Sequence, residues 1–233
     1  MDWHERQKML KFSFPVNIES PKSTYEIPYG HIVRDTDGDE NPGQRWIDVS
    51  GFQNGNAYGL TVINDAKHGY NVIGNDMRIS IARSAVFAHH RPRKIEPDGI
   101  YQWMDQGIHT FRMVVIPHNG TWLESKIAQQ AEELMAPPVA IYQGIHGGKL
   151  PKSGSFLSVD NPSVIVSSIK QAEDNSDIII RCVEISGHTT SSTIDLRFAG
   201  KKWNGSFRAF EIKTLRMNSM SGEIIETNLL EEV

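Results

Sequence analysis

Cysteine is nearly absent from the sequence, since Cys182 is the only one among 233 residues. A single thiol excludes an intrachain disulfide and any zinc site that rests on several thiolates. We therefore expect a reducing compartment, with the cytoplasm as the predicted location. Because Cys182 lies within the apolar run 178–183, the sequence predicts a buried core residue there rather than a nucleophile.

Long apolar runs and an excess of basic charge are also missing. No stretch approaches the ~20 residues of a membrane span, and residues 1–14 lack the apolar segment of a signal peptide. Lys and Arg number 24 against 28 Asp and Glu, which gives a net charge of −4. This balance argues against nucleic acid as a partner, because phosphate-backbone binding needs concentrated basic residues. We expect neither a membrane nor a nucleic acid partner.

Helical periodicity is scarce, and period-two alternation dominates the chain, as in residues 11–14. Turn pairs such as Asn54-Gly55 separate the alternating stretches. The pattern predicts an all-β fold, a large antiparallel β-sandwich. Besides the first strand, the expected strands are 24–27, 31–34, 45–49, 57–64, 77–83, 109–116, 139–142, 156–159, 164–172, 178–186, 190–199, 206–215 and 223–227.

One short helix is expected near 122–135, where apolar residues recur at helical spacing. Thr121 and Glu124 have the spacing of a capping box, and Pro137-Pro138 predicts the end of the helix. The Gly-, Lys- and Ser-rich segment 144–155 is the predicted linker. It would separate a main β portion, 1–143, from strands in 156–233, which either continue the same sandwich or form a small second β-domain.

The densest polar cluster, residues 64–71, directly follows the strand that ends in Thr-Val-Ile. Asn64, Asp65, Lys67 and Tyr70 offer an amide, a carboxylate, an ammonium and a phenol, the mixture of donors and acceptors that sugar hydroxyls require. The alternative is a polar turn whose residues serve only the backbone geometry. The residues alone leave both interpretations open.

Other polar motifs lack diagnostic spacing. His89-His90 with Asp98 and Asp105 could approach a metal only in a suitable loop, and we expect a solvated loop instead. The acidic run 35–40 resembles the start of a calcium loop, but position 12 is Trp46 rather than Glu, so an acidic turn is expected. We predict no metal site.

Paired carboxylates are the tools of glycosidases. The strand-associated candidates show no distinctive pair, and we predict no catalytic residue. These candidates are Asp160, Glu184, Asp195 and Glu211.

Several stretches, taken in order, resemble the C-terminal region of glycoside hydrolase family 38, the retaining, zinc-dependent α-mannosidases of the bacterial and cytosolic type. The matching stretches are 2–5, 14–17, 24–30, 44–50, 58–60, 64–71, 77–84, 107–111, 117–118, 166–174, 184–187 and 210–215. In that family the segment at 64–71 usually reads Asn-Asp-x-Lys-Tyr-Gly-Tyr-Asp. This chain has His68 and Asn71 at two of these positions.

The resemblance implies a galactose-mutarotase-like supersandwich that belongs to a much longer enzyme. In the family, an N-terminal barrel-like domain holds the zinc and the nucleophilic Asp. The resemblance therefore implies hydrolysis of terminal α-mannosides, with a mannose-containing carbohydrate and the catalytic domain as partners. This chain alone would be inactive and hold no cofactor. Asn64, Asp65, Lys67 and Tyr70 are then expected to face the sugar pocket or the catalytic domain.

Two alternatives remain at the level of sequence. A stand-alone carbohydrate-binding module would need exposed aromatic platforms, for which Trp46, Trp103, Trp122 and Trp203 are candidates, although burial in the core is favoured. A non-catalytic subunit could instead dock on a separate catalytic chain. Because a strand follows the start of the sequence so closely, we also expect an uncovered sheet edge and possible homo-oligomers.

Overall fold

The computed structural model describes residues 1–85, 98–149 and 151–232 and confirms the all-β prediction. The chain divides into two compact units. Unit 1 comprises Met1–Glu26 and Ile32–Ser125, and unit 2 comprises Ile27–His31 and Lys126–Val233. Within the described ranges, no helix is long and apolar enough to cross a bilayer.

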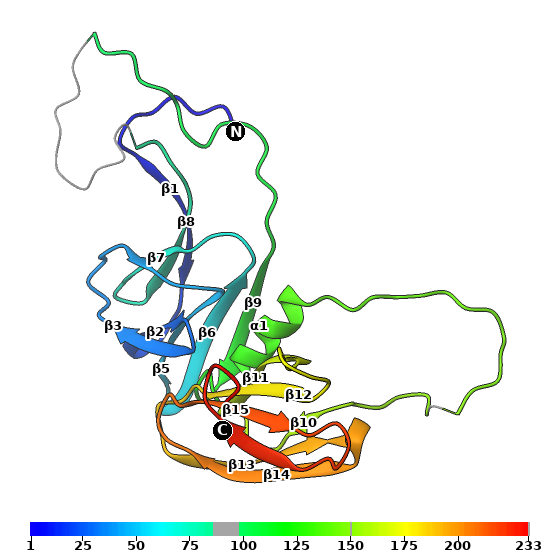
Figure 1. Cartoon of the computed structure of the whole chain (residues 1–233). Helices are drawn as coiled ribbons and strands as arrows, with labels where there is room; N and C mark the ends of the chain where they lie inside the picture. Colours follow the sequence, from blue (N-terminus) through cyan, green and yellow to red (C-terminus); the bar gives the residue numbers. More distant parts are fainter. Residues whose placement is uncertain (86–97, 150, 233) are drawn as a thin grey trace. The chain divides into compact units, whose positions relative to one another are not determined.

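Unit 1 contains two antiparallel sheets (Figure 1). One has the strand order β3-β2-β5-β6-β9 and the other the order β1-β8-β7-β4. Their strands are β1 (Met9–Pro15), β2 (Glu19–Ile27), β3 (Gly30–Arg34), β4 (Asn41–Pro42), β5 (Trp46–Gln53), β6 (Asn56–Asn64), β7 (Gly69–Ile73), β8 (Asp76–Arg83) and β9 (Met113–Asn119).

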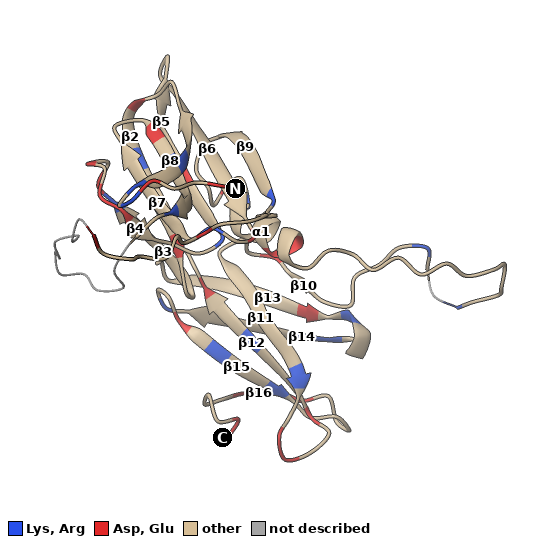
Figure 2. Ribbon diagram, turned by 90° about the horizontal axis from the view of Figure 1, so that it is seen from above, with Lys and Arg blue, Asp and Glu red and all other residues tan. Residues whose placement is uncertain are grey.

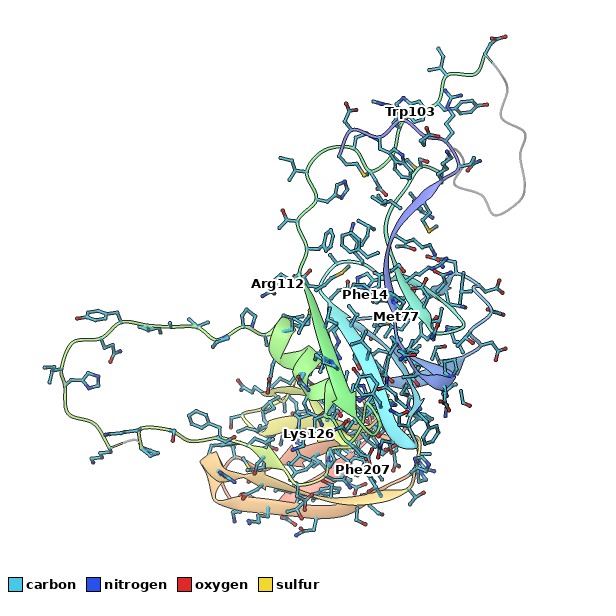
Figure 3. The ribbon with its side chains drawn as sticks, turned by 180° about the vertical axis from the view of Figure 1, so that it is seen from behind. Phe14, Met77, Trp103, Arg112, Lys126 and Phe207 are labelled. Atoms are coloured by element: carbon cyan, nitrogen blue, oxygen red, sulfur yellow. The ribbon has the colours of Figure 1, made fainter. Side chains whose placement is uncertain are left out.

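The core of unit 1 lies between these sheets, as in a β-sandwich. Ile47 and Val62 come from the five-stranded sheet, Met77 and Ile79 come from the four-stranded sheet, and all four belong to one buried cluster. Burial alternates along β8, as the period of a strand requires. Phe14 pairs with Met77 across β1 and β8, and Figure 3 shows the two side by side.

Unit 2 also consists of antiparallel sheets, with the orders β11-β12-β15-β16 and β10-β13-β14. Its elements are α1 (Ile127–Met135), β10 (Ser158–Val159), β11 (Val164–Gln171), β12 (Ile178–Glu184), β13 (Thr190–Leu196), the 3-10 helix η1 (Arg197–Ala199), β14 (Lys201–Phe207), β15 (Ile212–Met217) and β16 (Ile224–Thr227). Cys182 is fully buried in the core with Ile180, Phe207 and Leu215, which confirms its predicted core position. Burial raises the pKa of its thiol to about 12.

Local turn chemistry was a reliable guide to some boundaries. Asn54 and Gly55 both have positive φ, at 51° and 77°, and form the two-residue turn that joins β5 to β6. The helix ends at Met135, as the following prolines predict, but it begins at Ile127 rather than near residue 122. Lys126 has a φ of 53°, so the Thr121–Glu124 hydrogen bonds close a separate turn before the helix.

Other strand predictions were wrong. The expected strand 206–215 is broken between β14 and β15 by a turn in which Phe210 has a φ of 56°. Residues 139–142 form no strand, because no other strand pairs with them in the described part of the chain. β7 was missed because its first three residues belong to the polar cluster 64–71, and β14 because it opens with two lysines. The described residues of the predicted linker 144–155 form no helix or strand.

Candidate functional site

The four predicted site residues lie together where β6 connects to β7. Asn64 is the last residue of β6, Asp65 and Lys67 lie in the connection, and Tyr70 lies in β7. Because β6 and β7 belong to different sheets of unit 1, this connection crosses from one layer of the sandwich to the other. We call residues 65–68 the crossing loop.

Asn64 closes the crossing loop from the inside. Its Oδ1 accepts hydrogen bonds from the backbone N–H groups of Ala66, at 3.1 Å, and Lys67. Its Nδ2 donates to Tyr70 Oη at 2.8 Å. Asn64 is completely buried, and its amide group accepts through the oxygen and donates through the nitrogen at the same position. The side chain therefore fixes the loop and ties it to β7.

Tyr70 is the second internal support. Its hydroxyl donates to the backbone carbonyl of Gln44, and its ring meets Tyr25 edge-on with centroids 6.0 Å apart. Burial raises the pKa of Tyr70 well above its usual range, so the phenol stays protonated. Gly43 permits the close approach of the ring, because a Cβ at this position would lie 2.7 Å from Tyr70 Cε2.

Asp65 lies nearer the surface and is held by Arg112. Its two oxygens accept hydrogen bonds from the backbone N–H of Arg112 at 2.8 Å and from its Nε at 3.0 Å. The backbone hydrogen bond has the larger effect and the side-chain hydrogen bond the smaller one, and both lower the pKa of Asp65. The carboxyl group is therefore ionised at neutral pH. Arg112 directly precedes β9, and Figure 3 labels it there.

Lys67 contacts the same segment through a different interaction. Its Nζ lies 5.3 Å from the centroid of the Phe111 ring, a cation–π distance. Sequence reasoning did not select Phe111 or Arg112, although Phe111 ends the resembling stretch 107–111. The structure thus divides the four predicted residues into two buried supports, Asn64 and Tyr70, and two groups nearer the surface.

His68 ends the crossing loop and is exposed. Its Nδ1 lies 3.1 Å from the Gln44 carbonyl, the oxygen that also accepts from Tyr70. Because a carbonyl can only accept, Nδ1 carries the proton, and in the neutral ring Nε2 is then an acceptor.

A hollow of about 570 Å³ opens in unit 1 beside His68. Its polar lining includes Glu40, Ser80, Arg83 and Asp105, and its apolar lining is Met9, Pro42, Ile81 and Ala82. Glu40 is oriented by hydrogen bonds from Lys11 and Ser80, while the carboxylate of Asp105 accepts the Arg83 backbone N–H at 2.8 Å. The volume falls in the range of roughly 300–1,000 Å³ for small-molecule sites, and mixed polar groups over apolar surface suit a sugar.

The other carboxylates considered from the sequence have internal partners. Buried Glu184 accepts hydrogen bonds from Ser186, Gly187 and the backbone of Phe210, and so joins two turns of unit 2. Asp160, Asp195 and Glu211 also have hydrogen-bonding or ion-pairing partners. The acidic run 35–40 forms a turn in which Asp37 accepts the backbone N–H of Asp39.

The residues that the structure describes contain no cluster of side chains suited to a metal ion. Over residues 1–85, 98–149 and 151–232, no group of three or more His, Cys, Asp and Glu residues could hold an ion. His89-His90 lies outside these residues.

The aromatic candidates are mostly in the core. Trp46 and Trp122 are buried and pack together with centroids 5.0 Å apart, and Trp203 is buried in unit 2. Trp103 is half-buried, with the Arg6 guanidinium 5.0 Å from its centroid. Three of the four candidate platforms therefore present little ring surface to a ligand.

Two family models match this chain. Residues 1–98 match the glycosyl hydrolases family 38 C-terminal domain, and residues 163–233 match the family 38 C-terminal β-sandwich domain. The chain belongs to the C-terminal region of glycosyl hydrolase family 38. The resemblance that the sequence suggested is thereby confirmed.

Relatives of this family 38 region are much longer proteins. Mouse α-mannosidase 2C1 is 33% identical over 196 residues, which cover 79% of this chain and 17% of the relative. Dictyostelium discoideum α-mannosidase G is 28% identical over 205 residues, again 17% of that protein. The chain thus spans about a sixth of the length of these curated relatives.

The fold is shared with solved structures of the family. An α-mannosidase from Enterococcus faecalis V583 superimposes with a TM-score of 0.68 at 16% identity, covering 88% of this chain and 25% of that one. A second family 38 structure from Enterococcus faecalis gives a TM-score of 0.69.

Proposed function

We propose that this chain is the C-terminal β region of a cytoplasmic α-mannosidase that hydrolyses terminal α-mannosides of glycans or oligosaccharides. In this proposal it helps to form the sugar pocket, while the nucleophile and the zinc ligands belong to a separate catalytic part. The names and the lengths of the relatives support this division. The buried free thiol is compatible with a reducing compartment.

A zinc centre does not fit the residues that the structure describes, because they offer no group of three ligands. We therefore assign no step of hydrolysis to these residues. Their proposed contribution is to bind and orient the substrate or the catalytic part.

The crossing loop carries the proposal. Asn64 and Tyr70 use their polar atoms internally, so we assign them a positioning role. Asp65 and Lys67 lie on the loop that these two residues hold, and we propose that they hydrogen-bond to a mannoside or to polar groups of the catalytic part. A rigid support matters because contacts to substrate lose their effect when the geometry is loose.

The alternative of a stand-alone carbohydrate-binding module is less well supported. Trp46, Trp122 and Trp203 are buried, so three of the four tryptophans that were candidate platforms present little ring surface to a sugar. Docking on a separately encoded catalytic chain would use the same crossing loop. It differs only in whether the two parts share one polypeptide.

The test is a reconstituted enzyme. The probe is mouse α-mannosidase 2C1 truncated to remove the region matched here, mixed with this chain, with hydrolysis of an aryl α-mannoside as the assay. We expect Lys67→Ala and Asp65→Asn to lower kcat/KM by roughly tenfold or more. Lys202→Ala, a variant of an exposed lysine in unit 2, is the matched control and should leave the rate unchanged. Wild-type kcat/KM in both loop variants, with intact folding, would contradict the assignment.

A further inference from the structure

The segment between α1 and β10, residues 136–157, stands apart from the sheets of unit 2 in all three views (Figures 1, 2 and 3). Its described residues, all except residue 150, belong to no helix or strand. The segment nevertheless carries large apolar side chains. Val139, Ile141, Tyr142 and Ile145 are each at least 77% exposed.

Such exposure is unusual for a soluble protein. Single exposed apolar residues need no explanation, but a run of them marks an interaction site. Residues 137–148 contain no Asp, Glu, Lys or Arg, and Figure 2 shows this stretch uncoloured by charge. An uncharged, extended apolar segment would promote aggregation if it stayed uncovered.

The sequence of the segment favours a β-strand, although the segment belongs to none of the sheets in the described part of the chain. Val139, Ile141 and Ile145 share one face at period two, and β-branched residues favour strands. No strand in the described part of the chain pairs with this segment. A partner that offers a sheet edge or an apolar groove would supply what is missing, as in β-strand addition.

We propose that residues 139–145 are a docking segment for the catalytic part of a family 38 α-mannosidase. This inference rests on the proposed function. Residues 139–145 lie between the two stretches that the family models match. The relatives contain about five-sixths of their length outside the part aligned with this chain, which in those proteins leaves an extensive surface for such a contact.

The area available is adequate for a specific contact. Large aromatic side chains such as Tyr142 and Phe156, which is 73% exposed, each bury roughly 150–250 Å² in a complex. Tyr142 alone supplies about a quarter of the ~800 Å² that each partner contributes to a standard interface, and Phe156, outside 139–145 in the same 136–157 segment, would bring this to about half. The aliphatic residues of the segment add to this area.

Hydrogen–deuterium exchange tests the proposal on the unaltered chain, alone and mixed with the truncated mouse α-mannosidase 2C1. We expect the amides of 139–145 to exchange without protection in the chain alone and at least about tenfold more slowly in the complex. Sedimentation then compares variants. The double variant Ile141→Asp, Tyr142→Asp should weaken the complex by roughly tenfold or more. The control Met220→Asp, at a residue of unit 2 that is 96% exposed, should not.

The outcomes separate this proposal from the proposed function. A complex that forms while 139–145 stays unprotected refutes the docking segment and leaves the proposed function standing. Protection in the chain alone, with a dimer in sedimentation, makes a second copy the occupant and refutes the choice of partner. If the C-terminal region of the mouse enzyme binds its own catalytic part and this chain does not, the proposed function itself fails.

Discussion

Removing the imidazole of His118 should lower the unfolding free energy of unit 1 by more than a substitution at the surface does. His118 in β9 and Asp48 in β5 are both buried, with His118 Nε2 2.7 Å from Asp48 Oδ1. Thr61 in β6 donates to the same oxygen at 2.6 Å. The three residues therefore join three adjacent strands of the five-stranded sheet.

The expected magnitude follows from this burial. His118→Ala leaves the Asp48 carboxylate inside the protein, with the hydrogen bond from Thr61 still in place. Breaking one side of a buried pair costs about 3–5 kcal/mol of unfolding free energy. The assay is hydrogen–deuterium exchange of β5, β6 and β9 in increasing urea, because a two-unit chain need not unfold in one step. Lys202→Ala in unit 2 is the control and should change stability by no more than about 0.5 kcal/mol.

The pH dependence gives a second, independent readout. Burial alone would lower the pKa of His118, but the hydrogen bond and the charge of Asp48 outweigh it and raise the pKa above 6.5. A raised folded-state pKa means that the stabilisation is complete below the unfolded value near 6.5 and is lost as the pH rises through the folded value. The advantage of the native protein over His118→Ala should therefore shrink at alkaline pH. A cost below about 1 kcal/mol, or an advantage that grows with pH, would refute the reasoning.

Other perturbations test the internal supports and the core. Tyr70→Phe removes the hydroxyl shared with Asn64 and Gln44 and should lower the unfolding free energy of unit 1 by roughly 1–3 kcal/mol in urea; unchanged stability would contradict the network. Gly43→Ala brings a Cβ to 2.7 Å from the Tyr70 ring and should cost roughly 1–3 kcal/mol through overpacking, measured as a lower Tm for unit 1; a Tm equal to that of the native protein would count against this close approach. The thiol of Cys182, with its pKa raised to about 12, should resist an aromatic disulfide reagent in the native protein and react in urea; fast reaction in the native protein would mean that the thiol is accessible.

The sequence was informative wherever structure depends on neighbouring residues. The Asn54-Gly55 pair predicted its hairpin, because both residues tolerate positive φ. The apolar run around Cys182 predicted a buried strand, and the ordered set of short motifs pointed to the family whose models match the chain.

The sequence did not predict contacts between residues that are far apart along the chain. Asp65 pairs with Arg112, 47 positions away, and Asp48 with His118, 70 positions away, and no local pattern links them. The strand expected at 139–142 failed for a related reason, since alternation predicts strand propensity but not the presence of a partner strand.

The burial of Asn64 and Tyr70 was likewise not visible in a stretch of polar residues. That they face the sugar pocket or the catalytic domain stays a prediction. What the structure adds is the internal network that each of them joins.

The most direct measurement of the central claim is hydrolysis of an aryl α-mannoside by the purified chain, alone and mixed with truncated mouse α-mannosidase 2C1. The mouse C-terminal region is the positive control. The account predicts no turnover by this chain alone and turnover when the two parts are combined. Turnover by the chain alone that survives rigorous purification and chelators, or no activity in the mixture when the control is active, would contradict it.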